Sequence, residues 1–546
     1  MNKDTQHRVL KLVRAYHDRT KHRSDKYAAG PDFLDWEQQP DPFRRFEPTS
    51  SIQLPLEFDD LPNPNLNELK NQQPHIVLQD WGLKEISSLL RFSLGLAAWK
   101  VYGPDRWSLR CNPSSGNLHP TEAYIVVQGL SELKDGLYHY ATYSHSLELR
   151  AEIPTDNHNG IQPMIMVGLS SIAWREAWKY GERAFRYVQL DIGHAIGALA
   201  YSAAALGCFF ERIPLSPIEL GKLLGLSRTA DFNGAEPEYP DLLLNLCSNQ
   251  SEQSSPNINE KLISSLSSAD WHGRANRLSD HPKHLWPIID EVAQSLLTCA
   301  PCQQTTLSEL ALPDAPSGPD HPVRQIILQR RSAQAFSGKA TLQLSHFYEM
   351  LDHCLPRQLE HPWKSWPYQS RLHLLLFVHR VDGLAPGLYI FLRSENALPQ
   401  FKESMEQAFA WERVEACPSH LPLYRLISTE VKRAARALSC HQDIAASSFF
   451  SLGMLAEYDL ALEQSGPQIY PELFWEAGLI GQVLYLQAEA YGVRGTGIGC
   501  FFDDAVHDVL GLRDSRFQSL YHFTVGQPKP DNRLQTLPPY DHLDVE

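Results

Sequence analysis

Two short segments of the chain carry residues suited to holding an anion. Gln329 is followed by Arg330, Arg331 and Ser332. Arginine donates hydrogen bonds in a planar fork that matches phosphate oxygens, and the serine hydroxyl adds a donor. The second segment is rich in glycine, which lets a ligand approach backbone N–H groups closely, and it consists of Gly495, Thr496, Gly497, Ile498 and Gly499. The alternatives are a solvated helix face for the arginines and an ordinary tight turn for the glycines.

A third polar segment lies far away, in the first half of the chain. It consists of Pro113, Ser114, Ser115, Gly116 and Asn117, and continues as Leu-His-Pro-Thr-Glu to position 122. The glycine-rich segment is neither a phosphate-binding loop of the Gly-Lys-Ser/Thr type nor a dinucleotide fingerprint in strand-to-helix order. The three segments therefore need a fold that brings them together.

The chain contains an internal repeat. Residues 191–207 match residues 476–492 without a gap, and each stretch is followed by a Cys-Phe-Phe-acid segment, at Cys208 and at Cys500. Upstream, the sequence Gly-Leu-Tyr follows an apolar run in both halves, ending at Tyr138 and at Tyr389. These ordered matches predict two copies of one domain, at residues 75–246 and 320–535.

Each copy alternates helical patterns with short strand-like runs, which predicts an α+β fold. Gly193, Gly197, Gly478 and Gly481 lie inside otherwise helical patterns, where each costs roughly 1 kcal/mol relative to alanine. Either close helix packing at a central interface or a crowded core explains them. Residues 1–74 are expected to form an extended surface arm, 247–319 a partly ordered linker with a helical face over 285–297, and 536–546 a tail.

The chemistry-bearing segments are complementary between the copies. The first copy passes directly from Gly207 to Cys208, so it lacks the stretch from Val493 to Gly499, and it has no Arg-Arg-Ser. The second copy has no Pro-Ser-Ser-Gly segment before its first apolar run at Leu372. One copy thus carries what the other has lost.

Composition excludes several classes of protein. The 546 residues carry a formal net charge of −15, which argues against binding nucleic acid or an anionic membrane. Nine cysteines, spread thinly, do not form a disulfide framework and favour a reducing, cytoplasmic compartment. The charged first residues do not read as a secretory signal, and no apolar stretch is long enough for a transmembrane helix.

Together, these segments resemble the nitroreductase-like FMN proteins. The resemblance rests on the segments at 113–122, 330–332 and 495–499, and on two more, Lys179–Arg183 with Phe185–Tyr187, and Val525–Arg533. It is closest to the SagB-type branch, the azoline oxidases of modified-peptide biosynthesis. In that family two copies of an α+β domain form an intimate dimer, with FMN at the interface.

The resemblance implies a composite FMN site. Arg330, Arg331, Ser332, the segment Gly495–Gly499 and Arg533 would come from the second copy, and Pro113–Asn117 from the first. The mirror-image site lacks all of these parts, so we expect one FMN per chain. A fused pseudo-dimer of this kind can act as a monomer.

The resemblance also implies roles for Lys179 and Tyr180, which match a Lys-Tyr pair implicated in azoline oxidation. A lysine in a partly desolvated pocket can act as a base. The alternative is a solvated helix face. Substrates left open are azoline-containing peptides, nitro compounds and quinones, with NAD(P)H or molecular oxygen as co-substrate.

Two further hypotheses concern a role without catalysis and a pair of cysteines. The rival to an enzyme is a catalytically silent relative that keeps the fold as a peptide-binding or scaffold protein. Cys299 and Cys302 have the spacing of a redox or metal site, but one such pair without a second is not a zinc site. No metal site is predicted.

Overall fold

The computed structural model describes residues 3–71, 78–153, 163–248, 260–280, 285–302, 305–307, 312–316 and 318–543. The predicted start of the first domain at 75 and much of the predicted linker, including 249–259, fall outside the described residues. The described chain contains two antiparallel seven-stranded sheets, one in each half. The predicted α+β class and tandem organisation are confirmed.

The two sheets have the same strand topology. The first runs in the order β2 (Ser51–Gln53), β7 (Ser146–Glu152), β6 (Gly136–Ala141), β5 (Thr121–Gln128), β8 (Met164–Ser171), β10 (Tyr239–Ser248) and β9 (Cys208–Ile213). The second runs in the order β14 (Glu412–Arg413), β15 (Leu423–Ser428), β13 (Gly387–Phe391), β12 (Leu372–Val378), β16 (Phe450–Glu457), β18 (Phe517–Gly526) and β17 (Arg494–Ile498).

The registers of the two sheets agree as well. Val127 pairs with Gly136 in the first sheet, and Val378 pairs with Gly387 in the second. The two Gly-Leu-Tyr segments therefore begin equivalent strands, opposite the ends of the two apolar runs. The internal repeat seen in the sequence is a repeat of structure.

The repeat differs from the sequence-based prediction at the glycine-rich segment. Residues 494–498 form the edge strand β17, not a turn, and its topological counterpart is β9, which starts at Cys208. The first half therefore has a strand at this place and does not lack one. The difference is that β9 carries bulky side chains such as Phe209 and Phe210, whereas β17 carries glycines.

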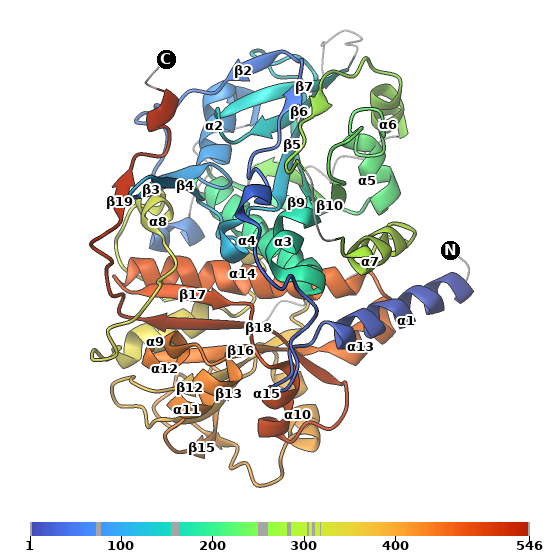
Figure 1. The fold of residues 1–546 in the computed structure, drawn as a ribbon. Helices are drawn as coiled ribbons and strands as arrows, with labels where there is room; N and C mark the ends of the chain where they lie inside the picture. The colour runs from blue at the N-terminus through green and yellow to red at the C-terminus, as the bar shows by residue number, and fades with distance from the viewer. Residues whose placement is uncertain are drawn as a thin grey trace.

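Two long helices, α4 (Ala184–Ala205) and α14 (Ile469–Ala490), pack against each other between the sheets (Figure 1). Every residue of α4 is buried, as expected for a largely apolar helix packed between two sheets. A Cβ added to Gly193 would overlap the carbonyl oxygen of Trp475 and lie 2.8 Å from the Cα of Gly478. Close helix packing thus explains these glycines.

The N-terminal segment begins with a helix, where the sequence predicts an extended arm. Residues Lys3–Arg19 form helix α1, with Val9, Val13 and Tyr16 buried at helical spacing. The charged residues between them masked this pattern. The segment also joins the two halves, because Arg19 pairs with Glu182 of the first and Lys21 pairs with Asp504 of the second.

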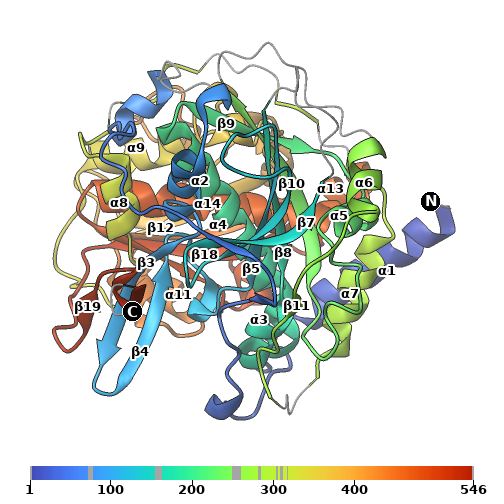
Figure 2. The same cartoon turned by 90° about the horizontal axis from the view of Figure 1, so that it is seen from above.

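The C-terminal segment returns to the first half (Figure 2). Strand β19 (Gln535–Leu537) pairs with β3 (Leu96–Tyr102), which pairs with β4 (Asp105–Arg110). The hydroxyl of the buried Tyr540 accepts a hydrogen bond from the Leu96 N–H at 3.0 Å. The predicted tail is therefore packed onto the first half.

The predicted helical face over 285–297 is confirmed as helix α7 (Pro287–Leu297), which packs against α1. Two short strands, β1 (Phe46–Glu47) and β11 (Arg274–Ala275), pair with each other. The remaining helices are α2 (Leu83–Arg91), α3 (Ala173–Tyr180), α5 (Pro217–Leu223), α6 (Glu260–Ser267), α8 (Val323–Gln329), α9 (Leu344–His353), α10 (Leu398–Ser404), α11 (Lys432–Leu438), α12 (Asp443–Ser447), α13 (Tyr458–Ser465) and α15 (Asp503–Leu510). Within the ranges given above, no helix has the length and apolar character needed to cross a bilayer.

Candidate functional site

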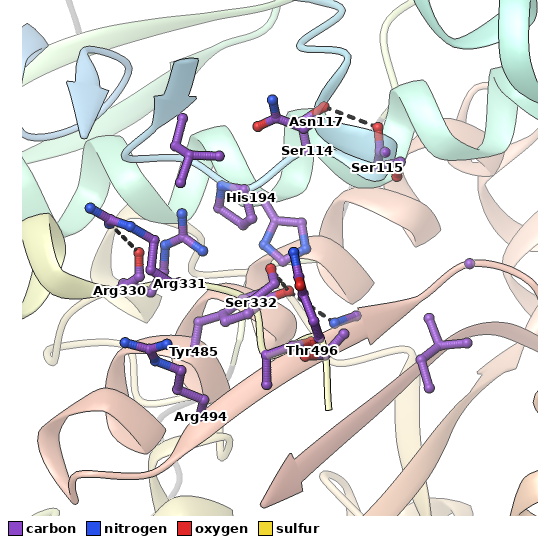
Figure 3. Close-up of a pocket in the computed structure, with 18 of the residues that line it drawn as sticks. Ser114, Ser115, Asn117, His194, Arg330, Arg331, Ser332, Tyr485, Arg494 and Thr496 are labelled. Atoms are coloured by element: carbon purple, nitrogen blue, oxygen red, sulfur yellow. Dashed lines mark hydrogen bonds between the residues drawn. The ribbon is translucent and has the colours of Figure 1, made fainter. Parts of the chain in front are cut away.

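A cavity of about 540 Å³ lies where the two halves meet (Figure 3). Its walls come from six parts of the chain that are distant in sequence. They include Pro113–Asn117, Tyr180, Tyr187, Asp191 and His194 from the first half, and Arg330–Gln334, Tyr485, Arg494, Thr496–Cys500 and Pro528–Asp531 from the second. The three segments singled out in the sequence thus meet at one place.

The segment Pro113–Asn117 is anchored on helix α4. The backbone N–H of Ser115 donates to Asp191 Oδ1 at 3.1 Å, and the Ser115 hydroxyl donates to the same oxygen at 3.2 Å. Gly116 has a φ of +59°, and a Cβ there would lie 2.5 Å from the hydroxyl of Tyr180 and 3.1 Å from Lys179 Nζ. Glycine therefore allows this turn to lie directly against the Lys179–Tyr180 pair.

One end of the cavity is strongly cationic. Arg330, Arg331, Arg494 and Lys100 all line it. The buried Arg330 donates through Nε to the carbonyl of Cys111 at 3.2 Å, which ties the second half to the first. Burial and the charge of Arg330 lower the pKa of Arg331 to about 10.

The negative charge near these cations is sparse. Glu489 lies 3.7 Å from Arg494, and the hydrogen bonds that Arg330 and Arg331 donate go to backbone carbonyls. Clustered guanidiniums with so little carboxylate nearby form a site that an anion would stabilise. Phosphate matches the fork geometry of arginine.

Strand β17 forms a second wall. The Tyr485 hydroxyl accepts a hydrogen bond from the Gly497 N–H at 2.9 Å and lies 2.8 Å from Ser332 Oγ. A Cβ on Gly497 would overlap the Tyr521 hydroxyl, and one on Gly499 would overlap the Tyr187 ring. The glycines thus let the strand backbone lie close to the aromatic side chains around the cavity. Gly495 belongs to this strand, but it is not among the residues that line the cavity.

The Lys179–Tyr180 pair forms the C-terminal end of helix α3. Tyr180 lines the cavity and packs against Tyr187, with ring centroids 4.6 Å apart. Burial, with the nearby Glu176, raises the pKa of Tyr180 well above its usual value, so the phenol stays protonated. Lys179 Nζ lies 5.4 Å from the Tyr180 ring centroid, behind the lining residues.

Arg533 is not brought together with the other predicted site residues. Its side chain is 72 % exposed and forms an ion pair with Asp531 at 2.7 Å. The neighbouring Asp531 lines the cavity, but Arg533 does not. A local partner two residues away thus holds the guanidinium at the surface.

Several residues of the site were not singled out from the sequence. Asp191 lines the cavity, and burial raises the pKa of its carboxyl to about 7. Glu176 lies beside it, and burial together with the charge of Asp191 raises its pKa well above the usual value. Arg494 directly precedes the glycine-rich segment, which was a usable signal, whereas Asp191 and Glu176 lie within helical patterns that mark no site.

The mirror-image place between the halves is nearly closed. Its cavity measures about 10 Å³ and is lined by Trp366, Glu472 and Glu476, among others. Glu476, the counterpart of Asp191, accepts a hydrogen bond from the Arg371 N–H at 3.0 Å, just as Asp191 does from Ser115. Arg212 pairs with Glu472 and lies over the rings of Trp366 and Trp475. The two halves have the same backbone arrangement, but large side chains fill the mirror-image place.

Comparison with known proteins agrees with this description. Residues 327–527 match the model of the nitroreductase family. A Methanocaldococcus jannaschii protein, provisionally named a nitroreductase, is 26 % identical over 135 residues. The match covers 23 % of this chain and 64 % of that relative, so this chain spans less than two thirds of its length.

One solved structure shows the same fold over nearly the whole chain. A crystal structure of a protein from Anabaena variabilis, also provisionally named a nitroreductase, matches with a TM-score of 0.63 at 21 % identity. The match covers 95 % of this chain and 99 % of that one. A chain of the Escherichia coli microcin synthetase McbBCD complex, solved with truncated pro-MccB17 bound, matches with a TM-score of 0.28 at 16 % identity, over 37 % of this chain and 70 % of that one. Residues 327–527 thus match the nitroreductase family model, and the whole chain has a tandem nitroreductase-like fold.

Proposed function

We propose that this protein is an FMN-dependent oxidoreductase whose two halves together build one flavin site. The observation that carries the proposal is the meeting of Pro113–Asn117, Arg330–Ser332 and Thr496–Gly499 around one cavity. Each segment alone has an ordinary structural explanation. Their convergence from three distant parts of the chain is what a shared ligand would require.

The residues present fit FMN in size and charge. Ligand pockets typically measure ~300–1,000 Å³, and this cavity measures about 540 Å³. Arg330, Arg331 and Ser332 would hold the phosphate, because they lie at the end where cations outnumber carboxylates. The glycines of β17 and the turn at Pro113–Asn117 would hold the ring system between the two halves. Arg533 is not part of this proposal, because its side chain faces solvent.

Bound FMN would supply hydride acceptance and donation, with NAD(P)H or molecular oxygen as co-substrate. The residues of the protein would orient the bound flavin and shield it from water. Tyr180 would present its protonated hydroxyl to the cavity as a hydrogen-bond donor. Lys179, whose Nζ lies near the same turn, would hold or accept a proton there.

One site per chain is supported by the asymmetry of the two places. The mirror-image cavity of about 10 Å³ has no room for a flavin. It also lacks an arginine pair and a glycine strand, since β9 carries Phe209 and Phe210 instead. The protein would then work as an internal pseudo-dimer, without needing a second copy of itself.

The proposed substrate is an azoline-containing peptide or another small oxidisable or reducible compound. The sequence resemblance to the SagB-type oxidases at Lys179–Tyr180 supports the first. Nitro compounds and quinones remain candidate substrates on the strength of the nitroreductase-like fold alone. We place the activity in the cytoplasm, because nine cysteines spread thinly through a long chain suit a reducing compartment.

Flavin affinity tests the placement of the phosphate. The double variant Arg331→Ala with Ser332→Ala should weaken FMN binding at least about tenfold, because charge-assisted hydrogen bonds are worth ~1.5–3 kcal/mol each. Arg513→Ala, which removes an exposed arginine of the same half, is the matched control and should bind like the parent. Fluorescence titration with FMN measures both. Equal affinity in all three proteins would show that the phosphate lies elsewhere.

A further inference from the structure

Two cysteines from different parts of the second half meet at the wall of the cavity. Cys440 lies between helices α11 and α12, and Cys500 follows β17. Their Sγ atoms are 2.6 Å apart, although the residues are 60 positions apart in sequence. Both side chains are partly exposed, and Cys500 lines the cavity itself.

The surroundings favour a thiolate on Cys500. The Cys440 thiol, the imidazole of His22 and the buried guanidinium of Arg183 lower the pKa of Cys500 to about 5, although burial opposes them. Cys440 behaves oppositely, because its hydrogen bond to Cys500 and its burial raise its pKa. Tyr27 faces Cys440, and Tyr180 and Tyr187 face Cys500, all as neutral phenols. An asymmetric pair of this kind provides one attacking thiolate and one protonated partner.

His22 is positioned for this contact by its own backbone. Its Nδ1 accepts a hydrogen bond from the Ala28 N–H at 3.0 Å, which leaves Nε2 to carry the proton. The His22 N–H donates to Asp503 Oδ2 at 2.9 Å, and Arg183 pairs with the same oxygen at 2.8 Å. The N-terminal segment thus brings a hydrogen-bond donor to a thiol of the second half.

The backbone at Cys440 is held in an unfavourable conformation. Cys440 has a φ of +49° and His441 a φ of +60°, two consecutive non-glycine residues in the left-handed region. Such strain persists only where the surroundings impose it and is concentrated at functional sites. Gln442, the next residue, donates through Nε2 to the carbonyl of Cys500 at 3.2 Å, which ties the two segments together.

The other seven cysteines differ from this pair. Six are buried, and the partly exposed one is Cys417, whose pKa is raised to about 12 by burial. Cys299 and Cys302, the pair noticed in the sequence, are buried thiols with pKa values raised to about 11 and 12. A reactive thiolate is therefore expected at Cys500 alone.

We propose that Cys440 and Cys500 form a reversible dithiol–disulfide redox centre on the cavity wall, which exchanges with low-molecular-weight disulfides. The Cys500 thiolate attacks one sulfur of the small disulfide, forms a mixed disulfide and releases one thiolate. Cys440 then attacks the Cys500 sulfur, forms the internal disulfide and releases the second thiolate, which takes the proton of Cys440. The protein dithiol loses two electrons and the small disulfide gains them.

This centre does not depend on the flavin. It can be tested on the flavin-free full-length chain, so its failure and the failure of the flavin proposal are distinguishable. Transient redox chemistry of this type is compatible with a reducing compartment, where stable structural disulfides are rare.

The test is equilibration with reduced and oxidised glutathione, followed by alkylation and peptide mass mapping. We expect a Cys440–Cys500 disulfide that forms with oxidised glutathione and disappears with reduced glutathione. Cys440→Ser should instead keep glutathione attached to Cys500, and Cys500→Ser should show neither product. Cys417→Ser is the control and should match the parent.

Two results would overturn the proposal. One is the absence of the internal disulfide at excess oxidised glutathione in the folded parent. The other is alkylation by iodoacetamide at pH 6 that is no faster at Cys500 than at Cys417, where we expect at least a tenfold difference. The rate comparison uses the parent protein, so it stands even if a variant fails to fold.

Discussion

The backbone N–H of Ser115 donates to Asp191 Oδ1 at 3.1 Å and so holds the Pro-Ser-Ser-Gly turn on the central helix α4. Glu476 and Arg371 form the same contact in the other half. An open cavity lies beside the Ser115–Asp191 contact. Beside the Arg371–Glu476 contact, tryptophan and arginine side chains fill the space. The function that we propose rests on this difference.

Asp191 should make the protein less stable as the pH rises from about 4 to 7. Its folded pKa, about 7, is raised above the unfolded value by burial, so its contribution to stability is full below the unfolded pKa and is lost as the pH rises through 7. The loss is up to about 4 kcal/mol. Asp191→Asn keeps an oxygen for the Ser115 N–H and should flatten this part of the profile. Urea unfolding of both proteins at pH 4, 5, 6, 7 and 8 measures it, and parallel profiles would refute the prediction.

Gly193→Ala should destabilise the fold by about 1–3 kcal/mol or more, because the added methyl group meets the backbone of helix α14. Gly221→Ala is the control, since its added methyl group would meet nothing closer than 3.6 Å. Because Gly221 lies in helix α5, its replacement by alanine should raise the free energy of unfolding by up to about 1 kcal/mol. Thermal unfolding midpoints compare the two, and an unchanged midpoint for Gly193→Ala would contradict the close helix contact.

Tyr180→Phe should separate binding from turnover. The ring contact with Tyr187 remains, so FMN affinity should change less than about twofold, while loss of a positioned hydrogen-bond donor lowers kcat by ~10²-fold. Tyr102→Phe, an exposed tyrosine outside the cavity, should leave both unchanged. Steady-state kinetics on an accepted substrate and FMN titration provide the two readouts. Equal kcat for all three proteins would exclude Tyr180 from the reaction.

Cys440→Ala should raise the pKa of Cys500, because the largest cause of its lowering is the hydrogen bond between the two thiols. The alkylation rate of Cys500 should then reach half its maximum at a higher pH than the value near 5 expected for the parent. Alkylation rates between pH 4 and 9, followed by mass spectrometry, measure the shift. An unchanged midpoint would mean that His22 and Arg183 set the pKa without Cys440.

The fold could be predicted well from the sequence, because a repeat with ordered matches constrains two domains at once. The Gly-Leu-Tyr segments fell on equivalent strands in the same register. Charged residues surround Val9, Val13 and Tyr16 and hide the apolar spacing of helix α1. Glycine is rare in strands, so strand β17 could not be predicted from its sequence.

The candidate site was harder to predict in detail. Residues with distinctive types, such as Arg330, Ser332 and Gly497, could be singled out, and they line the cavity. The exposed position of the Arg533 side chain could not be predicted, because its ion pair with Asp531 depends on local geometry. Asp191 and Cys440 gave no signal, since their importance comes from neighbours that only the tertiary fold supplies. The role of each residue in flavin binding stays a prediction.

The central claim is one flavin site built by both halves, and the flavin count per chain tests it most directly. The protein is saturated with FMN, desalted, denatured by heat, and the released flavin and the chain are quantified by absorbance. We expect about one FMN per chain, held by the cavity lined by Arg330 and Gly116. Two FMN per chain, or none retained even from excess FMN, would contradict it.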